Sequence, residues 1–264
     1  MPIDYLPTWV FFLISIGLVV LAVEIGFRVG RKVRGKSADA TDPTAASIAS
    51  VILGLQAFML AFTFGIVANR YDARRTLARE EANSIRTTWH RADLLPEPDR
   101  GRSKALLEDY TDRRIAIARS GDLGQARDSL QGFRNDLQQI WEIAAANGRA
   151  DPDSHIGALY IGSVNEIANL HATRTVIGLD ARIPPTIWLA LISLLMLGMI
   201  ALGYNSGMAN SRRSRVIPVL ATAFSLVLSL IAALDQPGNS LMPVSQQPLV
   251  NVLGEMRESA GPTN

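Results

Sequence analysis

The chain has 264 residues, of which 48% are hydrophobic and 19% are charged, and its mean hydropathy is positive. This composition is too apolar for an ordinary soluble domain and indicates a membrane protein that lies in a lipid bilayer. The formal net charge is only +2, and the basic residues sit mostly beside the apolar segments, which argues against nucleic acid as a partner. The absence of cysteine excludes disulfides, thiolate catalysis and cysteine metal sites.

A first membrane helix is predicted from about Thr8 to Val29. The residues before it lack the positive charge of a secretory signal, and no cleavage site of small residues follows it, so we expect the helix to be retained. Near its far end, Glu24 lies four residues before Arg28. This spacing predicts a local ion pair, although an acidic side chain inside a membrane can also coordinate ions.

A second membrane helix is predicted over the twenty-four uncharged residues Ala45–Ala68. This length is ample for a hydrocarbon core of roughly 30 Å. No glycine or proline separates its end from the charged run Asn69–Arg75, so we expect the same helix to leave the bilayer as a charged stalk.

Two stripes run along this second helix. Large apolar residues recur at four-residue spacing: Phe58, Phe62 and Ile66. Small residues form an adjacent stripe: Ala57, Ala61 and Gly65. The small residues permit close helix contact, while the large ones predict either ordinary packing and lipid contact or a hydrophobic constriction in a pore.

Several segments along the chain carry a resemblance to a known family. They are LAFTFGIVANRYDARR from Leu60, EEANSIRTTWHRADLLPEP from Glu80, NEIANLHATR from Asn165, RIPPTIW from Arg182 and LDQP from Leu234. With these segments the chain resembles an uncharacterised bacterial membrane family with a bestrophin-like domain, and more distantly the bestrophin anion channels.

The resemblance implies a function. Bestrophins are pentameric anion channels whose second helix lines the pore with a hydrophobic neck, and the matching neck positions here are Phe58 and Phe62. The next position inward is Gly54, which has no side chain to constrict a pore. The acidic calcium clasp of bestrophins has no counterpart, because the corresponding segment offers only Asp235, so the resemblance implies no calcium cofactor.

The basic start of the stalk admits two interpretations. In a ring of subunits, Arg70, Arg74 and Arg75 would surround the mouth of a pore and raise the local concentration of anions, with Ile66 lining the path just before them. Alternatively, these arginines anchor the helix at lipid headgroups and pair with acidic neighbours: Asp72, Glu80 and Glu81.

The region from residue 69 to 185 is predicted to be a helical extramembrane domain. The stalk should continue to Leu94, and a second helix should run from Arg102 to Arg119. Asp122 is expected to cap a third helix that extends through Ala144. An Asn-Gly turn at residues 147–148, followed by the segment DPDS, should separate it from a fourth helix over Ser154–Gly178.

The fourth of these helices has two faces at 100° per residue. Its polar ridge is predicted to contain Asn165, Glu166, Asn169 and Thr173. His171 and Arg174 project from the apolar side, where they would contact headgroups or the helix end, or else a carboxylate such as Glu80 or Glu81. Because Glu80 and Glu81 are adjacent, we expect them on a solvated, salt-bridged face and not as a catalytic pair.

Two further membrane helices are predicted at Thr186–Tyr204 and Val216–Leu234. A polar tail follows, with one short amphipathic segment around Leu249–Met256. The fold class is therefore an all-α membrane protein with four transmembrane helices and a helical extramembrane domain between the second and third. The expected divisions are residues 1–68 and 186–234 for the two helix pairs, 69–185 for the domain and 235–264 for the tail.

Four spans place both termini and the large domain on one side of a bacterial inner membrane. Eight basic residues lie on or beside the two short loops: Arg28, Arg31, Lys32, Arg34, Lys36, Arg212, Arg213 and Arg215. Seven lie near the membrane on the other side: Arg70, Arg74, Arg75, Arg79, Arg86, Arg174 and Arg182. Because short loops count for more, the charge rule favours short loops in the cytoplasm and the domain outside, whereas bestrophins have the opposite arrangement.

No enzymatic chemistry is predicted. His90, His155 and His171 lack metal-ligand spacing, and no phosphate-binding loop, nucleophile elbow or dinucleotide fingerprint occurs, so we expect neither metal nor cofactor. Two functions of different classes remain. One is a homo-oligomeric channel for small ions such as chloride, and the other is a non-conducting sensor or scaffold whose helical domain binds a partner.

Overall fold

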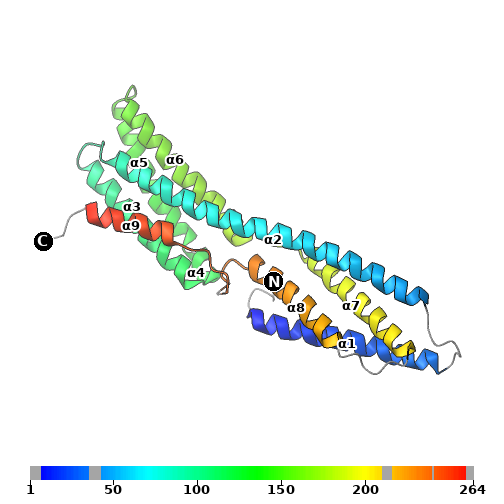
Figure 1. Cartoon of the computed structure of the whole chain (residues 1–264). Helices are drawn as coiled ribbons and strands as arrows, with labels where there is room; N and C mark the ends of the chain where they lie inside the picture. Colours follow the sequence, from blue (N-terminus) through cyan, green and yellow to red (C-terminus); the bar gives the residue numbers. More distant parts are fainter. Residues whose placement is uncertain (1–6, 36–42, 210–215, 240, 260–264) are drawn as a thin grey trace. The chain divides into compact units, whose positions relative to one another are not determined.

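The computed structural model describes residues 7–35, 43–209, 216–239 and 241–259. Of the short-loop charges counted above, Lys36, Arg212, Arg213 and Arg215 lie outside these ranges. The described helices are α1 (Thr8–Arg34), α2 (Pro43–Ala92), α3 (Asp99–Ser120), α4 (Leu123–Asp128), α5 (Leu130–Ala150), α6 (His155–Thr175), the π-helix η2 (Val176–Asp180), α7 (Pro185–Met208), α8 (Val216–Asp235) and α9 (Gln247–Ser259) (Figure 1). No strand occurs among the described residues, which confirms the predicted all-α class.

Within the described ranges, four stretches of helix are long and apolar enough to cross a membrane, and they belong to α1, α2, α7 and α8. Their number and order agree with the prediction. The second is part of a helix of 50 residues, which continues without interruption into the charged segment as expected.

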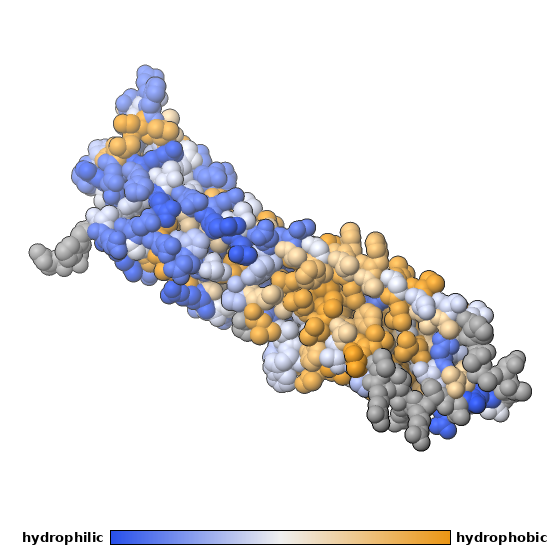
Figure 2. Space-filling model, in the orientation of Figure 1, coloured by the Kyte–Doolittle hydropathy of each residue, from blue (hydrophilic) through white to orange (hydrophobic). Residues whose placement is uncertain are grey.

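The chain divides into two compact units. Unit 1 consists of Met1–Asn69 and Arg182–Gln236, and unit 2 consists of Arg70–Ala181 and Pro237–Asn264. Figure 2 shows mainly hydrophobic side chains over the helices of unit 1 and mainly hydrophilic ones on the visible face of unit 2. Unit 1 is therefore the membrane unit, and unit 2 is the extramembrane unit.

In unit 1, α1 and α7 run parallel and touch through their backbones. Phe11 packs edge-on against Trp188 near their beginnings, with ring centroids 5.7 Å apart. Near their ends, Arg34 donates from Nη1 to the Met208 carbonyl at 3.2 Å. Four glycines lie between these contacts, and a Cβ on any of them would overlap a carbonyl oxygen of the facing helix: Gly26, Gly30, Gly203 and Gly207. Glycine spacing of this kind brings membrane helices into close contact.

Two segments that carry the family resemblance meet in unit 1. Asp235, from LDQP, accepts a hydrogen bond at Oδ1 from the backbone N–H of Ile183 at 3.0 Å. Its backbone carbonyl accepts from Arg182 Nη1 at 2.6 Å. The end of α8 is thereby tied to the RIPP segment that precedes α7.

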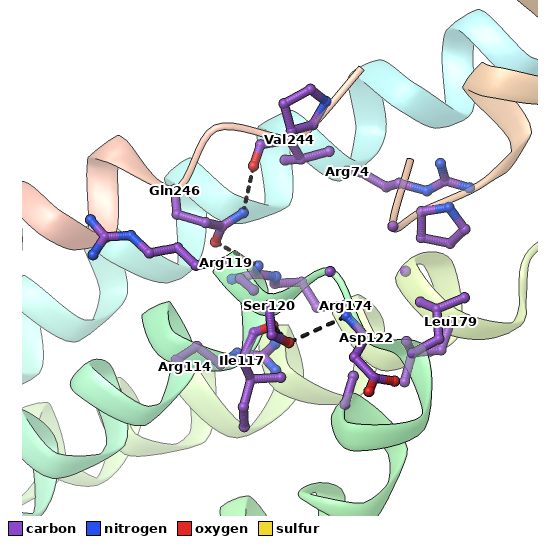
Figure 3. A pocket seen from close by; sticks show the side chains of 18 of the residues that line it. Arg74, Arg114, Ile117, Arg119, Ser120, Asp122, Arg174, Leu179, Val244 and Gln246 are labelled. Carbon is purple, nitrogen blue, oxygen red and sulfur yellow. Dashed lines mark hydrogen bonds between the residues drawn. The ribbon is translucent and has the colours of Figure 1, made fainter. Parts of the chain in front are cut away.

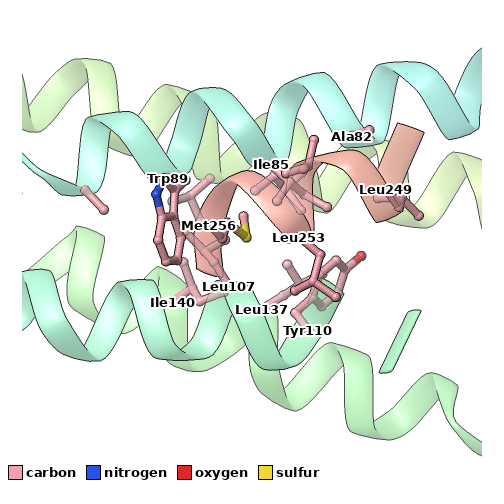
Figure 4. Packing of buried hydrophobic residues seen from close by; sticks show 14 of the residues in the cluster. Ala82, Ile85, Trp89, Leu107, Tyr110, Leu137, Ile140, Leu249, Leu253 and Met256 are labelled. Carbon is pink, nitrogen blue, oxygen red and sulfur yellow. The ribbon is translucent and has the colours of Figure 1, made fainter. Parts of the chain in front are cut away.

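In unit 2, five helices share one hydrophobic core (Figure 4). The end of α2 contributes Ile85 and Trp89, while α3, α5 and α6 supply residues such as Leu107, Ile140 and Ile167. The fifth helix is α9, which buries four apolar residues: Leu249, Val252, Leu253 and Met256. The amphipathic segment predicted in the tail therefore lies against the domain.

Ion pairs fix the outer side of α9. Glu255 accepts from Arg86 of α2 through both carboxylate oxygens, at 2.7 and 2.9 Å. Arg257 pairs with Glu108 and Asp112 of α3 at 2.9 and 3.2 Å. Because these groups are exposed, their main effect is to fix the orientation of α9 on the unit.

Two local predictions in unit 2 were wrong, and a third was correct except for the form of the helix end. The expected third helix is divided at Ser129 into α4 and α5, although Asp122 caps α4 as predicted through Gly124 N and Gln125 N. The Asn-Gly pair makes no turn, because α5 continues to Ala150 and the Asn147 amide donates to Asp99 Oδ2 at 2.7 Å. The fourth helix ends at Thr175 and passes into the π-helix η2.

Candidate functional site: the exposed face of α2 and a buried arginine–glutamate cluster

The membrane part of α2 has one exposed face and one packed face within the chain. Phe58 and Phe62 are 66% and 61% exposed, and Val51 on the same face is 71% exposed. The opposite face buries a set of residues spaced three, four or seven apart: Ala49, Gln56, Leu60, Thr63 and Val67. The Phe stripe therefore makes no intramolecular core and is available to lipid, to another copy or to a water-filled path.

The small residues predicted beside this stripe share its exposure. Ala57, Ala61 and Gly65 are exposed, and so is Gly54, where a Cβ would meet no other atom within 4 Å. Ile66 is half-buried at the edge of the face. Close approach by another helix is sterically open along this surface.

The three arginines at the start of the stalk do not share one environment. Arg75 is exposed and lies near the ring of Tyr71, whereas Arg70 is half-buried. Arg74 departs from the expected solvent-facing side chain, because it is only 6% exposed and its Nε donates to the Ile177 carbonyl at 3.4 Å. The reason is helical spacing, since Arg74 points to the packed side of α2 while Arg75 points to solvent.

Glu24 forms the predicted local ion pair. Arg28 Nε donates to Glu24 Oε1 at 2.8 Å, and the arginine side chain is 77% exposed. This contact agrees with the simpler of the two interpretations of the intramembrane carboxylate.

The packed face of α2 contains a polar residue that the sequence analysis missed. Gln56 is 0% exposed, and neither its amide nitrogen nor its amide oxygen has a hydrogen-bond partner among the described residues. An unsatisfied amide in a membrane bundle costs free energy, so it marks a position to test. The sequence does single it out, because Gln56 is the only asparagine or glutamine between Ala45 and Ala68.

A buried ionic cluster lies within unit 2, and we call it the Glu81 cluster. Glu81 of α2 is 0% exposed. Its carboxylate accepts from Tyr110 Oη at 2.8 Å, from Arg114 Nε at 3.1 Å and from Arg174 Nη1. His171 completes the cluster, with Nδ1 3.4 Å from Tyr110 Oη.

Burial and positive charge shift the ionisation of this cluster. Burial lowers the pKa of Arg174 to about 10 and also lowers the pKa of Arg114. Burial, and then the charges of Arg114 and Arg134, lower the pKa of His171 to about 4. At neutral pH the imidazole is therefore uncharged, and two guanidinium groups face one carboxylate.

The Glu81 cluster corrects two expectations. Glu81 does not lie on a solvated face, because Arg114 and Arg174 from distant parts of the chain enclose it, while its neighbour Glu80 is exposed. Arg174 reaches a carboxylate, as one of the two alternatives predicted, and not a headgroup. The predicted polar ridge of α6 is correct, since its members Asn165, Glu166, Asn169 and Thr173 are exposed.

Metal ligation finds no support in the part of the chain that the structure describes. No three His, Asp or Glu side chains gather there closely enough to hold an ion.

Comparison with known proteins identifies the family. The Bestrophin-like domain family matches residues 16–249 of the chain. A crystal structure of a bacterial Bestrophin homologue from Klebsiella pneumoniae, carrying a point substitution, is similar with a TM-score of 0.67 at 12% identity, over 96% of this chain and 99% of that one. A second point variant of the same homologue gives a TM-score of 0.61 at 12% identity, over 95% and 98% of the two chains. None of the curated proteins compared matches the chain. The chain is a multi-pass membrane protein that belongs to the Bestrophin-like domain family.

Proposed function

We propose that the chain assembles into a homo-oligomeric ring, a pentamer, that conducts small anions such as chloride across the bacterial inner membrane. The α2 helices line the path, Phe58 and Phe62 form its neck, and Gly54 and Ile66 line the path on either side of that neck. The observation that carries the proposal is the exposed aromatic stripe of α2 in a chain of the Bestrophin-like domain family. A stripe of large apolar rings around an axis is the kind of constriction that gates by dewetting.

Basic residues after the stripe support the choice of anions. Arg75 is exposed and would contribute positive charge to a vestibule, with a smaller part from the half-buried Arg70. Arg74 contributes less to such a vestibule, because its side chain is buried.

The first test is chloride flux into liposomes that contain purified protein. The double variant Phe58→Ala, Phe62→Ala is compared with the parent, and Leu189→Ala, Leu197→Ala on α7 is the matched control, since these leucines are 67% and 54% exposed. Removing the rings should raise flux or change its selectivity, while the control should conduct like the parent. Flux absent from all three proteins, with insertion verified, would overturn the channel proposal.

Membrane orientation is a separate part of the proposal. We propose that the short loops face the cytoplasm and unit 2 faces outward, as the charge rule favours. Because the chain has no cysteine, a maleimide can label a single introduced cysteine without background from the parent chain. In spheroplasts, an impermeant maleimide should label Asn165→Cys in unit 2 but not Lys32→Cys at the end of α1, both of which are exposed positions. The reverse pattern would place unit 2 in the cytoplasm.

A non-conducting sensor or scaffold is the second candidate. It is favoured by the Glu81 cluster, which puts buried charge in unit 2 at residues to which the channel proposal assigns no role. Absence of flux together with ligand or partner binding by unit 2 would support this candidate.

A further inference from the structure

Unit 2 contains a cavity of about 350 Å³ beside the Glu81 cluster (Figure 3). Its wall comes from α2, the ends of α3 and α6, α4, the start of α5, the π-helix η2 and the segment that precedes α9. Ser120, Gly121 and Asp122 lie on its wall and are exposed, so the cavity opens to solvent there. Arg114 and Arg174, whose side chains are each only 13% exposed, also line it.

These two arginines carry more positive charge than the protein neutralises. Glu81 is the carboxylate paired with each of them, and no other carboxylate pairs with either among the described residues. Arg174 has one further partner, the Gln246 side-chain oxygen at 3.2 Å, which is uncharged. A buried charge without a counter-charge is costly, so the cluster favours an additional anion.

Arg114 has hydrogen-bonding capacity left over. To described residues it donates only through Nε, toward Glu81, and its guanidinium carbon lies 5.1 Å above the ring of Phe133. The two terminal nitrogens are therefore available while stacking holds the guanidinium plane in place. A carboxylate suits these donors, because it can accept from both at once.

The rest of the lining bears on the size and polarity of the ligand. Apolar side chains make up much of the wall: Leu77, Ile117, Leu123, Leu130 and Leu179. The acidic residue on the wall, Asp122, uses Oδ1 to cap α4 through Gly124 N and Gln125 N, which keeps its carboxylate at the helix end. An inorganic anion would leave the apolar wall uncovered, whereas an organic anion would cover it.

We propose that this cavity binds a small organic carboxylate with a compact apolar body, whose carboxylate contacts Arg114 and Arg174 and whose body lies against the leucines. The site lies within one chain, and the proposal goes beyond ion conduction and does not depend on it.

The test uses benzoate as the probe. Radiolabelled benzoate is equilibrated by dialysis against the full chain in a neutral detergent, with benzyl alcohol and inorganic phosphate as competitors. Binding should saturate at one benzoate per chain, and neither competitor should displace it at equal concentration. Displacement by benzyl alcohol would show apolar partitioning, and displacement by phosphate would show an anion site without a role for the apolar body. Either result would overturn the proposal.

Two variants probe the cavity itself. Gly178 lines it, and a Cβ there meets open space, so Gly178→Leu should fill the cavity and weaken benzoate binding by about tenfold or more. Gly162→Leu is the matched control, because Gly162 also faces open space but lies outside the cavity on the exposed side of α6. Equal affinity in the two variants would contradict the assignment.

Arg114→Lys tests the charged end of the site. Lysine can keep the ion pair with Glu81 but lacks the planar fork, so affinity should fall by about tenfold while the melting temperature stays close to that of the parent. Unchanged affinity in a folded Arg114→Lys protein would show that the terminal nitrogens of Arg114 do not bind the carboxylate.

Discussion

The interiors of the two units are packed with different kinds of residue. In unit 1, α1 and α7 approach where side chains are missing, at Gly26, Gly30, Gly203 and Gly207. In unit 2, large aromatic and aliphatic residues form the core, and a buried carboxylate is held by two arginines. The difference follows from the solvent. In lipid the hydrophobic effect does not drive helices together, so they associate through close van der Waals contact, whereas in water the hydrophobic effect buries large apolar side chains. One chain therefore follows two sets of packing rules.

The largest effect on stability is expected at Glu81, the buried carboxylate of unit 2. Glu81→Gln leaves two buried guanidinium groups without a carboxylate and should lower the free energy of unfolding by about 3–5 kcal/mol. Thermal unfolding in neutral detergent measures the loss. Glu80→Gln, at the adjacent exposed position, should melt like the parent. Equal melting temperatures for the two variants would show that the Glu81 cluster is not a source of stability.

The same cluster should make unit 2 sensitive to mild acid. The pKa of His171 is lowered to about 4 in the folded chain from an ordinary value of 6.5, so the unfolded chain binds the proton more tightly. The contribution of His171 to the free energy of unfolding is therefore fully present above about pH 6.5. It is lost as the pH falls toward 4, by about 3 kcal/mol between pH 7 and 4. His171→Phe should flatten this part of the pH dependence, whereas His155→Phe, at an exposed position, should retain it. Parallel curves for both variants would contradict this assignment.

A smaller loss of stability is expected at the glycines through which α1 and α7 of unit 1 touch. In Gly203→Ala the new Cβ would overlap the Val23 carbonyl, so α1 and α7 must separate, at a cost of about 1–3 kcal/mol. Gly17→Ala on α1 is the control, because its Cβ meets no atom within 4 Å. If both alanine variants unfold at the parent's temperature, the close approach of α1 and α7 does not stabilise the unit.

The smallest effect has the opposite sign. Gln56→Leu replaces a buried amide without a described partner and should stabilise unit 1 by about 1 kcal/mol. Thr63→Val on the same face is a comparison, because the Thr63 hydroxyl already donates to the Met59 carbonyl at 2.8 Å and its loss should bring no gain. A destabilised Gln56→Leu protein would indicate that the amide has a bound partner, such as water.

Local chemistry in the sequence predicts the helices well where one rule acts alone. An uninterrupted apolar and then charged run predicted α2 through the stalk, and Gly121, with φ of 65°, ends α3 close to the predicted end at Arg119. The Asn-Gly pair misled because α5 is held by tertiary contact, in which Asn147 bonds to Asp99 of α3. The helix break at Ser129 and the π-helix after Thr175 have no comparable local signal.

The candidate site was harder to predict for a similar reason. The exposure of Phe58 and Phe62 follows from spacing on a single helix, so a periodic pattern was enough to single them out. The burial of Glu81 depends on Arg114 and Arg174, which lie 33 and 93 residues away in the sequence, and charge patterns alone do not pair such distant residues. The paired glycines of α1 and α7 did carry a signal, since each pair is spaced by four residues, as in the small-residue motif of membrane helices.

The position of α9 has a consequence for the order of folding. This helix supplies four core residues to unit 2, yet α7 and α8 both precede it in the chain. During synthesis, part of the apolar surface of the earlier helices of unit 2 stays uncovered until α7 and α8 have been made and α9 can pack against it. Contacts such as Arg86 with Glu255, separated by 169 residues, then form last. Maturation of the extramembrane unit is thus coupled to insertion of the last two spans.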